Sequence, residues 1–211
     1  MPVLQPPKPL ISGLYAIVDP DFCGERDCLS VTREILEVGV SLLQVRIKGR
    51  SSRDARVIAQ AICDLKHTFS FTLIVNDDLA LAEAIEADGL HVGQGDMPVF
   101  EVRERWTGIL GLSTHTLDEV RMAARLPLDY IGFGAVFPTD TKGIAHPVPG
   151  LDLLREAVCL SPHPVVAIGG ITPERVPLVL KAGASAYAAI SALTAPADIR
   201  ETVEKFLRAS L

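Results

Sequence analysis

The chain has 211 residues and a mass of 22.7 kDa, a length that suits one large domain or two small ones. Its 20 Lys and Arg residues against 26 Asp and Glu residues give a net charge of −6, which excludes an extended basic surface for nucleic acid. Apolar residues make up 48% and aromatic residues only 5% of the chain. This composition excludes intrinsic disorder and is typical of a buried parallel sheet covered by helices.

The mean hydropathy of +0.31 does not predict a membrane protein, because no apolar run reaches the ~18 residues that a spanning helix needs. Residues 1–11 are rich in proline, which is unlike the apolar segment of a secretory signal. We expect them to form a flexible arm ahead of a single domain over residues 12–211. The cysteines form no Cys-x-x-Cys pair, so we expect a reduced, cytoplasmic protein.

Short β-rich runs recur along the chain, and each is followed by a helix-like stretch. From Leu14 to Ala186, 172 residues fall into seven intervals of about 25 residues, the length of a compact βα unit. Eight such units without a break in composition predict one (β/α)8 TIM barrel, with an open doubly wound sheet as the alternative. The expected strands are residues 14–18, 42–45, 72–75, 89–92, 109–112, 130–133, 165–168 and 186–190.

Three local signals mark where helices begin. Thr116-x-x-Glu119 fits a capping box, and Thr172-Pro173 places a capping residue ahead of proline at the first helical position. Ser51-x-x-Asp54 is a weaker form of the capping box. These positions agree with helices that follow the expected strands.

Polar residues gather where the expected strands end, which is where barrels of this class carry their chemistry. After the second strand, Gln44, Arg46 and Lys48 alternate and therefore share one face. Two cations and an amide suit a phosphate or diphosphate group. An ordinary solvated strand end explains the same residues equally well.

Carboxylates follow the third and fourth strands. Asn76 and Asp77 end the third strand, and Asp96 follows the fourth. Mg²⁺ is typically held by one or two carboxylates together with phosphate oxygens and water, so Asp77 and Asp96 predict a metal site. The alternative is helix capping by Asp77 or Asp78 and by Asp96, and Asp78 is expected to be a cap or a surface residue.

The fifth and sixth strands lead into hydroxyl-rich segments. Ser113 follows the fifth strand and can bind a ligand, whereas His115 is expected to be a structural hydrogen-bonding residue. The longest connection, after the sixth strand, predicts a lid over a phosphorylated ligand, with a plain surface loop as the alternative. It contains Thr139, Asp140, Thr141 and Lys142.

The seventh and eighth strands end in small residues. Gly169 and Gly170 allow close approach to the backbone, and Ile190 and Ser191 open the next helix. Amides at these two places form the phosphate site common in such barrels. A tight turn is the alternative explanation for the glycine pair.

Taken in order, these segments resemble the thiamine-phosphate synthase family, also called thiamine-phosphate pyrophosphorylase. The resemblance covers the chain from about residue 14 to residue 207. The matching segments are Gln44-x-Arg46-x-Lys48, Asn76-Asp77, Ala87-Asp88-Gly89-x-His91-x-Gly93-Gln94-x-Asp96, Gly111-Leu112-Ser113-Thr114-His115, Phe137-Pro138-Thr139-x-Thr141-Lys142, Ala167-Ile168-Gly169-Gly170-Ile171 and Ile190-Ser191-Ala192.

The resemblance implies an enzyme that joins hydroxymethylpyrimidine diphosphate to hydroxyethylthiazole phosphate and releases pyrophosphate, with Mg²⁺ as cofactor. It implies Asp77 and Asp96 as metal ligands. The implied pyrimidine diphosphate ligands are Gln44, Arg46, Lys48, Asn76, Ser113 and Lys142, of which Arg46, Lys48, Ser113 and Lys142 also act in catalysis. The implied thiazole phosphate ligands are Thr139, Asp140, Thr141, Gly169, Gly170, Ile190 and Ser191.

Two other functions remain open at this point. A thiazole tautomerase of the same fold needs the phosphate site without most of the diphosphate and metal residues. A non-catalytic barrel that binds a phosphorylated ligand needs the glycine site but not the carboxylate pair. The expected partners are small phosphorylated molecules, not nucleic acid or membrane, and self-association into a homo-oligomer is left open.

Overall fold

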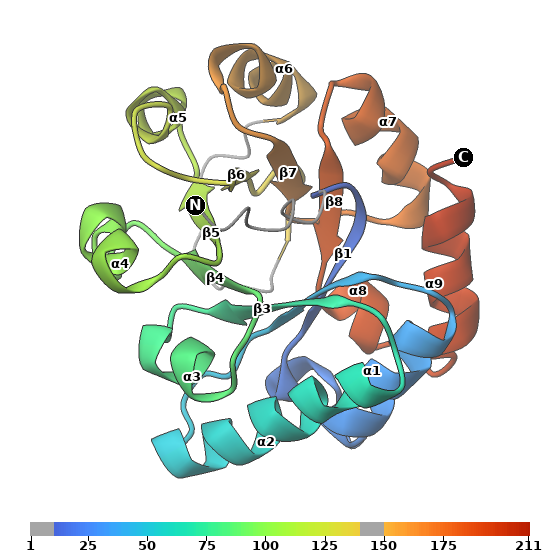
Figure 1. Cartoon of the computed structure of the whole chain (residues 1–211). Helices are drawn as coiled ribbons and strands as arrows, with labels where there is room; N and C mark the ends of the chain where they lie inside the picture. Colours follow the sequence, from blue (N-terminus) through green and yellow to red (C-terminus); the bar gives the residue numbers. More distant parts are fainter. Residues whose placement is uncertain (1–10, 140–149) are drawn as a thin grey trace, which may run out of the picture.

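The computed structural model describes residues 11–139 and 150–211. Within them, eight parallel strands pair in sequence order, and β8 closes onto β1 to form a barrel with helices around it (Figure 1). The predicted (β/α)8 barrel is therefore confirmed. The strands are β1 (Gly13–Val18), β2 (Leu42–Val45), β3 (Thr72–Asn76), β4 (Gly89–Val92), β5 (Ile109–Thr114), β6 (Tyr130–Phe133), β7 (Val165–Ile168) and β8 (Ala186–Ala189).

The described helices follow the strands as expected. Three short 3-10 turns are η1 (Pro20–Phe22), η2 (Leu65–His67) and η3 (Pro173–Arg175). The α-helices are α1 (Cys28–Glu37), α2 (Ser52–Asp64), α3 (Leu79–Ala84), α4 (Val99–Arg105), α5 (Leu117–Ala123), α6 (Gly150–Leu160), α7 (Val176–Lys181), α8 (Ser191–Thr194) and α9 (Ile199–Arg208).

Capping side chains fix several helix starts. The hydroxyl of Ser51 accepts a hydrogen bond from the Asp54 amide, and the hydroxyl of Thr116 accepts one from the Glu119 amide, as the sequence predicts. Thr172 precedes a 3-10 turn and makes no side-chain capping bond there. The helix in this unit, α7, begins only after that turn, because the first residues take the tighter 3-10 geometry.

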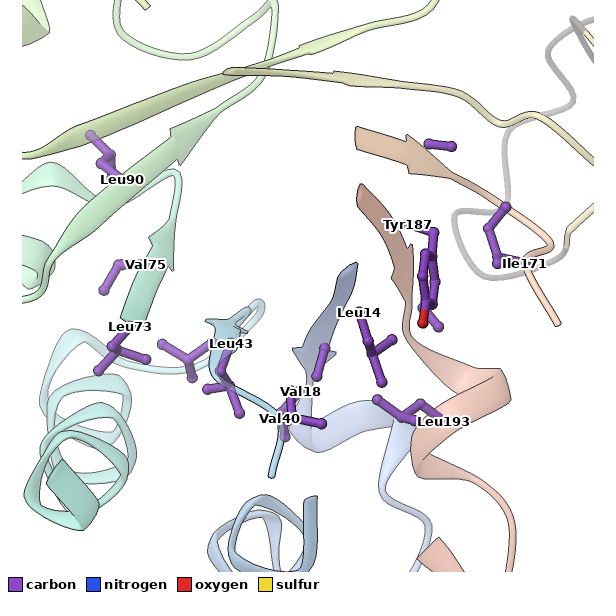
Figure 2. Close-up of a cluster of buried hydrophobic side chains, with 14 of the residues drawn as sticks. Leu14, Val18, Val40, Leu43, Leu73, Val75, Leu90, Ile171, Tyr187 and Leu193 are labelled. Atoms are coloured by element: carbon purple, nitrogen blue, oxygen red, sulfur yellow. The ribbon is translucent and has the colours of Figure 1, made fainter. Parts of the chain in front are cut away.

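Alternation along the strands divides the core into two parts. Tyr15 and Ile17 of β1 belong to the cluster that fills the barrel, whereas Leu14 and Val18 belong to the shell between strands and helices. Figure 2 shows part of this shell, with side chains of several strands directed toward the surrounding helices. Apolar side chains thus lie on both faces of the sheet, as a parallel sheet covered by helices requires.

Large and small residues alternate inside the barrel. The register places Gly111 of β5 opposite Tyr130 of β6, and Gly111 also pairs with His91 of β4. A Cβ atom added at Gly111 would lie 2.2 Å from the Tyr130 ring. The glycine therefore provides the space that the tyrosine ring occupies, and the barrel interior is closely packed at this level.

The boundary of the N-terminal arm lies at the edge of the described chain. Ile11, the last residue assigned to the arm, is buried and packs with the side chains inside the barrel. Residues 1–10 lie outside the described part, so the arm stays a prediction. No helix among the described residues is both long and apolar enough to cross a membrane.

All three tyrosines of the chain are buried, and burial raises the pKa of Tyr15, Tyr130 and Tyr187. Above pH of about 10 the unfolded chain loses phenolic protons that the folded chain keeps, so the free energy of unfolding falls as pH rises further. We expect ultraviolet titration to show no phenolate until the protein unfolds, with circular dichroism changing in the same pH interval. Phenolate formation in the folded protein near pH 10 would contradict this expectation.

Candidate active site

A cavity lies in the mouth of the barrel and receives side chains from every strand or strand end. It is lined by Tyr15, Ile17, Gln44, Arg46, Asn76, His91, Ser113, Tyr130, Gly132, Val166, Ile168, Ala188 and Ile190. Five of the predicted ligand residues are in this lining: Gln44, Arg46, Asn76, Ser113 and Ile190. The structure therefore brings together residues that are 146 positions apart in the chain, from 44 to 190.

The cationic strand end after β2 is held by a buried carboxylate. Arg46 forms an ion pair with Asp19, whose side chain is fully buried at the end of β1. Asp19 also accepts a hydrogen bond of 2.9 Å from the Asp21 amide, so its position is fixed from two directions. A buried carboxylate with two such partners holds the guanidinium of Arg46 at the cavity wall.

Lys48 lies farther out than Gln44 and Arg46. Its ammonium group forms an ion pair with Asp77 at the end of β3, and neither residue lines the cavity. The predicted shared face of β2 is thus correct for Gln44 and Arg46, while Lys48 follows the end of the strand and reaches the rim. The backbone pairing with β1 continues one residue past β2, where the Arg46 amide donates to the Val18 carbonyl oxygen, and this pairing does not extend to Lys48.

The two carboxylates predicted to bind metal lie next to each other. Loss of hydration raises the pKa of Asp96, and a hydrogen bond with Asp77 adds to this effect. Asp96 also accepts a hydrogen bond of 2.7 Å from the Gly93 amide. Two carboxyl groups in contact repel when both are ionised, and a divalent cation between them relieves that repulsion.

Helix capping does not account for this pair. Asp78, not Asp77, caps α3 by accepting a hydrogen bond of 2.9 Å from the Leu81 amide. The first residue of α4 follows Pro98, and Asp96 makes no capping bond to that helix. Asp77 itself has a φ of 63°, a left-handed conformation that Asp tolerates better than most residues.

The carboxylates of Asp77 and Asp96 fit an Mg²⁺ ion. They supply two hard oxygen ligands at an open rim, beside the ammonium group of Lys48. Among the described residues no group of three or more His, Cys, Asp or Glu side chains forms a closed metal site. An ion held here would therefore need substrate oxygens and water to complete its coordination.

A row of hydrogen bonds runs along the cavity wall from β2 to β5. Gln44 Nε2 donates to the Tyr15 hydroxyl over 2.9 Å, and the Tyr15 and Tyr130 hydroxyls are 2.8 Å apart. His91 Nδ1 is 2.8 Å from the Tyr130 hydroxyl, and His91 Nε2 is 2.9 Å from Ser113 Oγ. Two predicted ligands, Gln44 and Ser113, are therefore the ends of one connected network.

His115 forms hydrogen bonds with other parts of the protein, as we expect of a structural residue. Its ring Nδ1 is 2.8 Å from the Gly134 carbonyl oxygen, and its backbone amide donates to Glu119. We expect His115→Gln to change kcat less than threefold, because the ring does not line the cavity. Steady-state rates with the substrates that the resemblance implies check this, and a complete loss of activity would show that His115 acts in the reaction.

Two features of the chain itself require glycine at the two positions after β7: the backbone conformation and the close approach of a neighbouring segment. Gly169 and Gly170 have φ values of 94° and 62°, and a Cβ atom at Gly170 would lie 2.5 Å from the Pro138 carbonyl oxygen. Arg175 donates to the Gly170 carbonyl oxygen over 2.6 Å and covers the Phe137 ring at 4.6 Å. The turn thus holds the segment after β6 against the segment after β7.

The other predicted ligands follow β6 and β8 or lie outside the described chain. Thr139 is half-buried at the end of the described segment, and Ser191 is the first residue of α8. Asp140, Thr141 and Lys142 lie outside the described residues, so their predicted roles stay predictions. The same holds for the expectation that residues 137–149 form a lid.

Some residues of the site were not predicted. Asp19 follows the first strand directly, and the rule that strand ends carry chemistry could have found it. Tyr15 and Tyr130 face the cavity from β1 and β6, and strand alternation alone could have placed them inward. His91 of β4 also lines the cavity.

Fold and site together define a (β/α)8 barrel with cationic side chains at its mouth and a carboxylate pair at its rim. A profile of the family described as thiamine monophosphate synthase matches residues 14–193. The chain belongs to this family.

Individual relatives agree with this assignment. The thiamine-phosphate synthase of Dictyoglomus thermophilum is 39% identical over 199 residues, covering 93% of this chain and 89% of the relative. Thiamine-phosphate synthase 1 of Aquifex aeolicus is 36% identical, covering 93% and 92% of the two chains. The solved thiamine phosphate pyrophosphorylase of Pyrococcus furiosus superposes with a TM-score of 0.85 at 34% identity, covering 94% of this chain and 95% of that one.

Proposed function

We propose that the protein is a Mg²⁺-dependent, cytoplasmic thiamine-phosphate synthase. It joins hydroxymethylpyrimidine diphosphate to hydroxyethylthiazole phosphate and yields thiamine monophosphate and pyrophosphate. The observation that carries this proposal is the meeting of Gln44, Arg46, Asn76 and Ser113 in one cavity, with Asp77 and Asp96 at its rim. Relatives named as thiamine-phosphate synthases, at 36% and 39% identity over nearly the whole chain, support the same reaction.

Catalysis of this reaction requires stabilisation of the negative charge that develops on the leaving group. In the proposed dissociative substitution, the bond between the pyrimidine methylene carbon and the diphosphate oxygen breaks, and its electron pair leaves with pyrophosphate. Arg46 and Lys48 are placed to stabilise this charge, and Lys142 is proposed to do the same. Arg46 needs no rearrangement for this role, because Asp19 already holds it at the wall.

Asp77 and Asp96 would hold Mg²⁺, which when bound supplies positive charge beside the diphosphate oxygens. Lys48 is paired with Asp77, so it stands where it can contact either the carboxylate or the diphosphate. Gln44, Asn76 and Ser113 would orient the pyrimidine diphosphate through hydrogen bonds. Each of these contributions positions or stabilises the substrate, and none requires a covalent bond to the protein.

The second substrate is proposed to bind across the cavity. Thr139, Asp140 and Thr141 with Gly169, Gly170, Ile190 and Ser191 would hold its phosphate group. The thiazole nitrogen would then attack the methylene carbon and form the new C–N bond. Such positioning is worth up to about 7–11 kcal/mol in ideal cases, which is why no further nucleophile is needed.

The test is to incubate the purified protein with both substrates and Mg²⁺ and to measure thiamine phosphate and pyrophosphate. We expect equal amounts of the two products and none when either substrate or Mg²⁺ is omitted. Isomerisation of a thiazole phosphate without condensation would instead assign a tautomerase. Ligand binding without any turnover would assign a non-catalytic binding barrel.

A further inference from the structure

In the row of hydrogen bonds between Gln44 and Ser113, each group can be assigned as a donor or an acceptor. Gln44 presents Nε2 to the Tyr15 hydroxyl, and an amide nitrogen can only donate. The Tyr15 proton therefore cannot point to Gln44, and its other close neighbour is the Tyr130 oxygen at 2.8 Å. Tyr15 thus donates to Tyr130.

The same reasoning assigns the donors and acceptors from Tyr130 to Ser113. The Tyr130 oxygen already accepts from Tyr15, so its proton points to His91 Nδ1 at 2.8 Å. A neutral imidazole that accepts at Nδ1 carries its proton on Nε2, and this proton points to Ser113 Oγ at 2.9 Å. Ser113 Oγ then accepts from the histidine, and its own proton is left to point into the cavity.

We propose that Tyr15, Tyr130 and His91 are positioning residues that make Ser113 a hydrogen-bond donor toward the substrate and keep His91 as the neutral Nε2–H tautomer. The proposal rests on the proposed function for the identity of that substrate. A serine set as a donor selects an acceptor, such as a diphosphate oxygen. It disfavours a ligand group that can only donate at this point.

Packing keeps the row in place. Tyr15 and Tyr130 are at most 1% exposed, and their rings meet at a centroid distance of 5.9 Å. A Cβ atom at Gly111 would lie 2.6 Å from His91 Nδ1, so the imidazole ring lies close against the β5 backbone. The hydroxyl protons stay in place at neutral pH, because burial raises the pKa of both tyrosines.

The first test reads the His91 tautomer without using activity. The wild-type protein is labelled with 15N-histidine, and the His91 signals are identified by their loss in His91→Gln. We expect 15N shifts of an unprotonated Nδ1 and a protonated Nε2. A protonated Nδ1, in a neutral or a charged ring, would overturn the proposal.

The second test removes one hydroxyl and keeps the ring. Tyr130→Phe takes away the donor to His91 Nδ1, so the preference for the Nε2–H tautomer is lost. We expect a kcat about tenfold lower, an unchanged KM for the thiazole phosphate, and 15N signals of His91 that no longer show a single Nε2–H tautomer. Tyr15→Phe is the second variant if Tyr130→Phe does not fold, and it should lose part of the same bias.

Tyr187→Phe is the matched control. Tyr187 is equally buried, lies in the shell between strands and helices (Figure 2) and does not line the cavity; its hydroxyl donates to the Phe206 carbonyl oxygen over 3.0 Å. It should lose stability without a change in kcat or in the His91 signals. If Tyr130→Phe and Tyr187→Phe have the same kinetics, the proposal is wrong. A wild-type protein that forms no thiamine phosphate would refute the proposed function, while the His91 tautomer would still decide the direction of the row.

Discussion

Asp77→Asn is expected to lower kcat/KM for thiamine phosphate formation by about a hundredfold or more at fixed Mg²⁺. The change keeps the size of the side chain but removes the charge that pairs with Lys48 and lies against Asp96. Asparagine tolerates the left-handed conformation at this position, where φ is 63°, so the local backbone should be retained. Steady-state kinetics across a range of Mg²⁺ concentrations measure the effect.

Asp78→Asn is the matched control for this variant. It makes the same change of charge one residue farther along, at the residue that caps α3. Asparagine caps helices about as well as aspartate, so stability should be nearly unchanged. We expect nearly wild-type activity for Asp78→Asn, and equal losses in the two variants would contradict a metal-binding role for Asp77.

Gly111→Ala is expected to destabilise the fold by about 1–3 kcal/mol or more. The added methyl group would lie 2.2 Å from Tyr130 Cζ and 2.6 Å from His91 Nδ1, so a ring inside the closed barrel has to move. Urea unfolding should show a lower midpoint with an unchanged m-value. Activity should fall as well, because both displaced rings belong to the cavity wall.

The control for Gly111→Ala is Gly95→Ala, in the connection after β4. An added Cβ atom at Gly95 has no neighbour within 4 Å among the described residues, and φ there is outside the left-handed region. Its free energy of unfolding should therefore change by no more than about 0.5 kcal/mol. A similar loss of stability in both variants would mean that close packing around Gly111 is not the cause.

Much of the fold could be predicted because it depends on local patterns. Each strand had to bury both faces, so apolar runs about 25 residues apart were sufficient to predict a barrel of eight units. The observed strands agree within one or two residues, with β5 extending to Thr114 and β8 ending at Ala189. The capping residues Ser51 and Thr116 could also be predicted, because the backbone amides they bind are only three residues away in the chain.

The candidate site was predictable only in part. The rule that strand ends carry chemistry located Gln44, Arg46 and Ser113, which line the cavity. It did not tell which carboxylate serves as a cap and which faces the rim, a choice that depends on the backbone turn between Asp77 and Asp78. This rule also did not show whether Gly169 and Gly170 are needed to bind a ligand or to allow close packing of the chain.

The sequence by itself determined the periodicity of the barrel, the helix starts and the kinds of polar group at the strand ends. Only the tertiary structure decided which of these groups meet. Asp19 reaches Arg46 because β1 and β2 are neighbours, and Gln44 is connected to Ser113 through three side chains from β1, β6 and β4. Such contacts depend on barrel closure and register, which join residues far apart in the chain, and no local pattern encodes them.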